Sequence, residues 1–111
     1  MKYGLMIEPD GEFSRIEFDN DTALDTLQNA VQGWVQAVDL NEDLTMWLNE
    51  EGKLIGLEHN MAAQRLWDEF YPMSDYVVGT VVITGGADAH GHTKGLTHES
   101  MERLDGFFAF G

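Results

Sequence analysis

The sequence predicts an α+β domain, in which two or three helices pack, on one face, against a mostly antiparallel sheet of five or six strands. Three observations support this fold class. Some short stretches alternate apolar and polar residues with the period of a strand, others repeat apolar residues with the period of a helix, and turn residues separate them. The 111 residues, 43% of them hydrophobic, predict a single domain over 1–111 with one core.

The chain begins with a predicted hairpin. Residues 2–7 and 13–18 both alternate as strands do, and the turn residues Pro9, Asp10 and Gly11 lie between them. These features predict two paired antiparallel strands.

A helix is expected next, over residues 23–32. Leu27 and Val31 recur at helical spacing, Thr22 is a typical N-cap residue, and Gly33 is placed to end the helix in a left-handed conformation.

Three short alternating stretches follow, over residues 34–40, 44–48 and 53–57. Polar turn residues separate them, and Gly52 supplies the backbone freedom that a tight hairpin needs. The pattern predicts a three-strand meander.

The last part of the chain combines helices with one strongly apolar strand. Asn60 is expected to cap a helix over 61–70, and residues 76–84 are apolar on both faces, as in a central strand. A glycine-rich loop spans Gly85–Gly95, and Thr97 is expected to cap a short final helix.

The C-terminal tail is unusually aromatic. Phe107, Phe108 and Phe110 follow Gly106, which is expected to redirect the chain after the short helix. Burial of each ring would contribute about 1.5–3 kcal/mol, so we expect the tail to pack on its own domain in a monomer. The alternative is a homodimer through the same three rings.

Charge and composition exclude several classes of function. Twenty acidic residues against 6 basic ones give a net charge of −14, which disfavours direct binding to nucleic acid or to an anionic membrane. The chain has no cysteine, no signal-peptide pattern and no long apolar run, so we expect a cytoplasmic protein without disulfides. Trp34, Trp47 and Trp67 lie in apolar patterns and are expected in the core rather than on a stacking platform.

Four segments carry a family resemblance. Residues 44–60, 27–38, 75–86 and 95–97, in this order and spacing along the chain, resemble the domain-of-unknown-function family 3846. The resemblance covers residues 1–104. It implies a bacteriophage or mobile-element origin, and it implies no activity and no catalytic residues.

The residues around the turn after residue 48 are the first candidate binding site. Asn49 and Asn60 carry amides that could bind a ligand or partner, and Glu50 and Glu51 add carboxylates. An Asx turn at Asn49 accounts for the same residue types without a ligand. The two glutamates lie in an expected exposed turn, which disfavours a catalytic role because catalytic acids need burial.

The glycine-rich loop is the second candidate site. Asp88, His90 and His92 have the donor types that bind Zn²⁺ or Ni²⁺, but a loop with several glycines is poorly preorganised, so a solvated loop without metal is the main expectation.

These observations favour a small, acidic, non-enzymatic accessory protein without a cofactor that binds a host or phage protein. Its most specific form is an acidic inhibitor that occupies the basic cleft of a nucleic-acid enzyme, as a mimic of DNA. Solubility or salt adaptation would explain the same charge. The alternative function is a small-ligand or metal-binding module that uses the Gly85–Gly95 loop.

Overall fold

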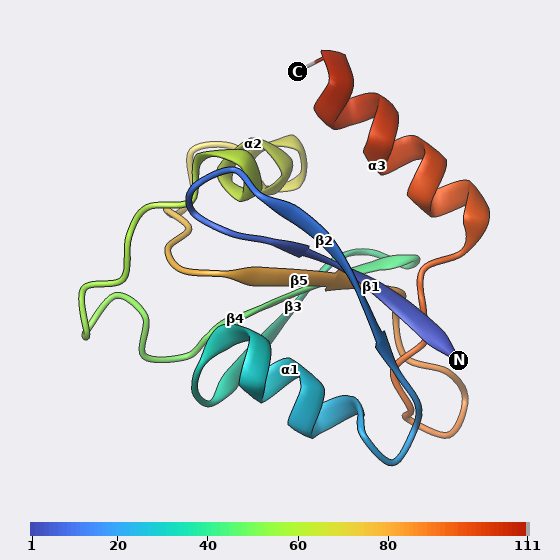
Figure 1. Cartoon of the computed structure of the whole chain (residues 1–111). Coiled ribbons are helices and arrows are strands. Elements are labelled where there is room, and N and C mark those ends of the chain that lie inside the picture. The colour runs from blue at the N-terminus through green and yellow to red at the C-terminus, as the bar shows by residue number, and fades with distance from the viewer. Residues whose placement is uncertain (111) are drawn as a thin grey trace.

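Five antiparallel strands form one sheet in the order β2-β1-β5-β4-β3 in the computed structural model (Figure 1). The structure describes residues 1–110, apart from the side chain of Phe110. The α+β prediction is confirmed. The elements are β1 (Lys2–Ile7), β2 (Phe13–Phe18), α1 (Ala23–Val31), β3 (Val35–Asn41), β4 (Leu44–Asn49), α2 (Met61–Phe70), β5 (Val81–Thr84) and α3 (His98–Phe110).

The helices cover both faces of the sheet, so the prediction that they share one face is wrong. Helices α2 and α3 lie on one side and α1 on the other (Figure 1). The cause is the central strand β5, in which all four residues are buried. Val81 and Ile83 belong to the core under α2 and α3, while the alternate residues Val82 and Thr84 are buried on the opposite face. A strand that is buried on both sides needs a cover on both.

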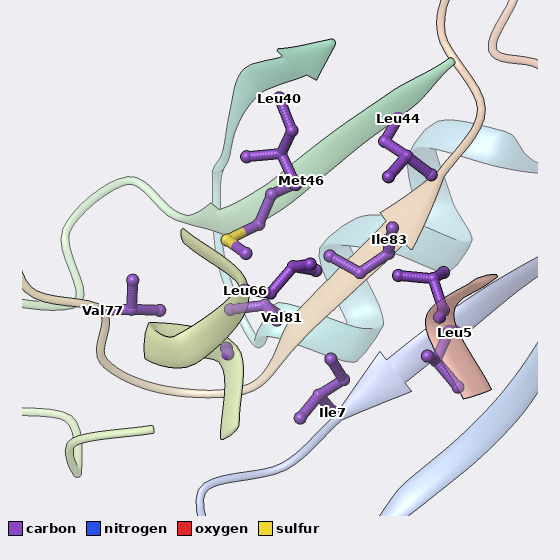
Figure 2. Close-up of a cluster of buried hydrophobic side chains, with 11 residues drawn as sticks. Leu5, Ile7, Leu40, Leu44, Met46, Leu66, Val77, Val81 and Ile83 are labelled. Atoms are coloured by element: carbon purple, nitrogen blue, oxygen red, sulfur yellow. The ribbon is translucent and has the colours of Figure 1, made fainter. Parts of the chain in front are cut away.

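The main core lies between the sheet and the two helices α2 and α3 (Figure 2). It takes alternate side chains from the middle strands, because successive side chains of a strand point to opposite faces. Its buried members are Leu5, Ile7, Leu40, Leu44, Met46, Ala63, Leu66, Val77, Val81, Ile83 and Leu104.

The N-terminal hairpin, α2 and the central position of β5 are confirmed. Strand β5 is shorter than predicted, however, because residues 76–80 do not join the ladder. Gly79 has a φ of +76°, and a Cβ there would lie 2.7 Å from a Leu57 methyl group. Only glycine adopts this conformation readily in so little space, so the chain turns here before β5 begins.

The predicted third strand of the meander, residues 53–57, is wrong. This segment is a series of turns, in which the Ile55 N–H donates to the Glu51 carbonyl and the Leu57 N–H donates to the Gly52 carbonyl. Strand β4 already pairs with β3 on one edge and β5 on the other, so it has no free edge for a third partner. Leu54 is 87% exposed as a result.

Both ends of α1 differ from the prediction. The Thr22 side chain does not cap the helix, because its hydroxyl is hydrogen-bonded to Asp19. The left-handed residue at the C-terminus is Gln32, at φ 62° and ψ 43°, and not Gly33. Gly33 is needed for a different reason: a Cβ there would lie 2.8 Å from the Asn49 side-chain nitrogen.

Helix α3 is longer than predicted and includes most of the aromatic tail. Thr97 does cap it, because the Thr97 hydroxyl accepts a hydrogen bond from the Ser100 N–H at 3.0 Å. The helix then continues through Gly106, so the prediction that this glycine redirects the chain is wrong. Phe107 and Phe108 pack against the main core, which confirms that these two rings pack on their own domain. The monomeric state stays a prediction. The predicted contributions of the Phe110 ring and of Gly111 lie outside the described residues.

The position of Gly106 inside α3 gives a stability prediction. A Cβ at Gly106 would meet no atom within 4 Å, and its φ is not in the left-handed region. Gly106→Ala should therefore raise the free energy of unfolding by about 0.5–1 kcal/mol, through the lower entropy of the unfolded chain. Urea denaturation would measure the change. A loss of stability would show that the chain turns at Gly106 instead of continuing the helix.

Candidate functional site

Asn49 is buried at the end of β4 and joins three segments. Its side-chain nitrogen donates to the Val31 carbonyl at 3.0 Å, and its Oδ1 accepts from the Glu51 N–H at 2.8 Å. The second bond is the Asx turn that the sequence predicts. The first holds the C-terminus of α1 against the sheet. Asn49 is 8% exposed, so the fold itself uses most of the binding capacity of this amide.

Asn60 is buried more deeply and is more fully bonded. Its Oδ1 accepts from the Ala63 N–H at 3.0 Å, which confirms the predicted cap of α2. Its Nδ2 donates to the Ile7 carbonyl at 3.0 Å and to the Gly79 carbonyl at 2.9 Å. The residue is 0% exposed, and β1, α2 and the segment before β5 meet at this one side chain.

Glu50 and Glu51 are exposed, as predicted for a turn. The structure places Glu50 beside Asn49, at the rim of a groove, while Asn60 lies apart from them in the interior junction. The four predicted binding residues therefore do not form a single site.

The Gly85–Gly95 loop folds back as a small hairpin. The Gly85 N–H donates to the Lys94 carbonyl, and the Asp88 N–H donates to the His92 carbonyl. Asp88 Oδ1 accepts from the His90 N–H at 2.8 Å and from the His92 N–H at 3.0 Å. The loop is therefore held by its own hydrogen bonds, and the carboxylate of Asp88 is central to them.

The predicted metal ligands lie near one another without forming a cluster. The imidazole rings of His90 and His92 have centroids 6.4 Å apart, and His92 Nδ1 lies 3.8 Å from Asp88 Oδ2. Among residues 1–110, no three His, Asp or Glu side chains are grouped to hold a metal ion. Metal binding by this loop stays the untested alternative to a solvated loop.

A groove of about 360 Å³ is the feature that sequence reasoning missed. It lies where the strands β3 and β4 meet the turns of residues 50–54. Its rim exposes Leu54 and Tyr76, which are 87% and 55% exposed. The sequence offers one signal for it, the apolar residue Leu54, which lies in the segment 53–57 predicted as the third strand of the meander. The groove is lined by Gln36, Val38, Leu48, Asn49, Glu50, Lys53, Leu54, Trp67, Asp75, Tyr76 and Val78.

The three tryptophans do not share one environment. Trp47 and Trp67 are half-buried, and the Trp47 indole donates to the Thr84 hydroxyl at 2.8 Å. Trp34, immediately before β3, is 66% exposed, so its predicted core position is wrong. It follows Gly33 and the left-handed residue Gln32, in the segment where the chain has left α1 and has not yet reached the sheet.

Comparison with protein families identifies the chain. The model of the family described as "Domain of unknown function (DUF3846)" matches residues 1–109. The chain belongs to the DUF3846 family. The comparisons found no match to a curated protein or to a solved structure. The description of the DUF3846 family names no activity. No helix in the described part of the chain is long and apolar enough to cross a membrane.

The hydrogen bonds of Asp88 give a pH prediction for this DUF3846 protein. The backbone N–H groups of His92 and His90, with the two nearby imidazoles, hold the pKa of Asp88 below its ordinary value of 3.8. Because the pKa is lowered, the ionised carboxylate stabilises the folded loop at any pH above the ordinary pKa. This stabilisation is lost as the pH falls through the lower pKa of the folded state. The amide NMR signals of His90 and His92 should therefore titrate with a midpoint below 3.8. This titration of the two amide signals should be absent from the Asp88→Asn variant. A midpoint at or above the ordinary value would contradict the hydrogen-bonded loop.

Proposed function

We propose that this DUF3846 protein is a small, non-enzymatic accessory protein of a phage or mobile element that binds a basic protein partner in the cytoplasm. Its acidic surface supports the proposal. The chain carries 20 Asp and Glu residues, and none of them is buried. The whole negative charge therefore faces solvent, where it acts on an approaching partner.

Few of these carboxylates are neutralised by neighbouring cations. In the described part of the chain, the ion pairs that involve lysine or arginine are Lys53 with Asp75 and Arg103 with Glu99. Other basic side chains contact uncharged groups, as when Arg15 lies over the Tyr3 ring and Arg65 over the Phe107 ring. The carboxylates are therefore left mostly free to attract a positively charged surface.

Such a surface suits a protein partner that itself binds nucleic acid. A cleft that binds phosphates is lined by lysine and arginine, and a protein with exposed carboxylates can occupy it in place of a nucleic acid. An acidic inhibitor of a nucleic-acid enzyme is the most specific form of the proposal.

Affinity capture at two ionic strengths tests this function. The immobilised protein should retain a basic protein from a bacterial lysate at roughly 0.1 M salt and release it at roughly 1 M, because the Debye length falls from about 10 Å to about 3 Å. Duplex DNA should displace the retained protein if the partner binds through its nucleic-acid cleft. Capture of no protein at either salt concentration, or capture that does not depend on salt, would contradict the proposal.

A further inference from the structure

Within residues 1–110, no strand pairs with the outer edge of β3. The register of β3 against β4 shows which backbone groups of β3 point toward this edge. The Glu50 N–H donates to the Trp34 carbonyl, and Val35 pairs with Asn49. Hydrogen-bonded and non-hydrogen-bonded pairs alternate along an antiparallel ladder. Val35 and Ala37 therefore belong to non-hydrogen-bonded pairs, and their N–H and C=O groups point away from the sheet.

The next outward residue, Asp39, supports this reading. Its carbonyl accepts a hydrogen bond from the hydroxyl of Tyr71, which lies beyond the end of α2. Tyr71 therefore covers one end of the edge, and the described structure places no such partner on Val35 and Ala37.

The two edges of the sheet are protected differently. On β2, the Glu8 N–H donates to the Glu12 carbonyl, and the alternation from this pair turns the backbone groups of the charged residues Arg15 and Glu17 outward. The exposed ring of Phe13 packs on Phe108 of α3, with 4.8 Å between the ring centroids. Charged side chains and helix cover are common ways to block strand addition. Strand β3 has neither a lysine nor a proline, and its outward stretch from Val35 to Ala37 is uncharged.

The groove lies beside this open edge. Gln36 and Val38 alternate with the outward-pointing residues, and they line the groove together with Leu48 of β4. A strand added next to β3 would place every second side chain on this face. Leu54 and Tyr76 expose apolar surface at the rim, where such side chains could pack.

Charge selects the kind of strand that fits. Asp39 lies at one end of the open stretch, and Glu50 lies beside its other end, bonded to Trp34. The nearest cation in the groove, Lys53, is paired with Asp75 and lies over the Tyr76 ring. A second copy of this chain would bring two charges of −14 together, whereas a basic segment would be attracted.

We propose that the β3 edge of this protein receives an extended, lysine- or arginine-bearing segment of its partner, which adds a strand to the sheet and packs apolar side chains into the groove. This inference rests on the proposed function, because it names the element through which the basic partner binds. Main-chain hydrogen bonds to Val35 and Ala37 would supply affinity, and the groove would supply specificity.

Synthetic peptides test the assignment directly. The probe is a roughly nine-residue peptide in which lysine alternates with valine and threonine, labelled for fluorescence anisotropy. Two matched peptides carry glutamate in place of lysine, or N-methyl groups on the amides that would face β3. The lysine peptide should bind and should slow hydrogen exchange at the Val35 and Ala37 amides. Both matched peptides should bind at least about tenfold more weakly.

A proline substitution distinguishes loss of binding at the β3 edge from loss of folding. Ala37→Pro removes an outward N–H without breaking a ladder bond, so the protein should stay folded while the affinity falls by about tenfold. Ala37→Thr keeps the N–H, and Glu17→Pro makes the same kind of change on the opposite edge. Both controls should bind the peptide as the wild type does.

Three results with the purified protein would overturn the assignment. They are no binding of the lysine peptide at about 1 mM, equal binding by Ala37→Pro, or a dimer of this chain that Ala37→Pro abolishes, since the edge would then belong to a second copy. The lysate capture distinguishes the two proposals. If Ala37→Pro retains the captured partner and salt still releases it, the acidic function stands and the edge assignment fails.

Discussion

The fold depends on one buried side chain, that of Asn60. Its carbonyl oxygen caps α2, and its amide nitrogen holds two main-chain carbonyls, one at the end of β1 and one before β5. The main-chain N–H of Asn60 donates to the Val77 carbonyl, and the main-chain carbonyl of Asn60 accepts from the Gln64 N–H. A buried polar group is costly unless it is bonded, so the three elements have to meet in this geometry for Asn60 to be accommodated. The main core then packs around the junction.

Asn49 has a related role on the other face of the sheet, where it ties the end of α1 to β4. The hydrogen bond requires glycine at position 33, because a Cβ on Gly33 would collide with the Asn49 side-chain amide. The two interior amides are thus used by the fold, and the groups available to a partner are on the surface. These are the exposed carboxylates, the groove and the open edge of β3, and the proposals for function rest on them.

Local patterns predicted the elements whose causes are local. The hairpin of β1 and β2, the cap and length of α2, and the Asx turn of Asn49 all follow from neighbouring residues, and all are confirmed. The predictions were wrong where the structure is determined by contacts between residues that are far apart in the sequence. Leu54 and Ile55 look like part of a strand, yet both edges of β4 are taken by β3 and β5. The open edge and the groove could not be predicted either, because they depend on the order of strands in the sheet. The likeness of segment 44–60 to its family was readable from sequence, but it carries no activity from which a site could be derived.

The most direct test of the central role of Asn60 is urea denaturation of Asn60→Asp at pH 5 and pH 7. Aspartate keeps the cap acceptor, but it loses both amide donors and buries a charge beside the Ile7 and Gly79 carbonyls. The free energy of unfolding should fall by about 3 kcal/mol or more at pH 7, or the protein should fail to fold. Burial should raise the pKa of this carboxyl, so part of the loss should be recovered at pH 5. The same change at the exposed Asn29, in the last turn of α1, should cost less than about 1 kcal/mol, because a charge at a helix end has only a small effect. An Asn60→Asp protein as stable as the Asn29→Asp control would contradict the central role of Asn60 in the fold.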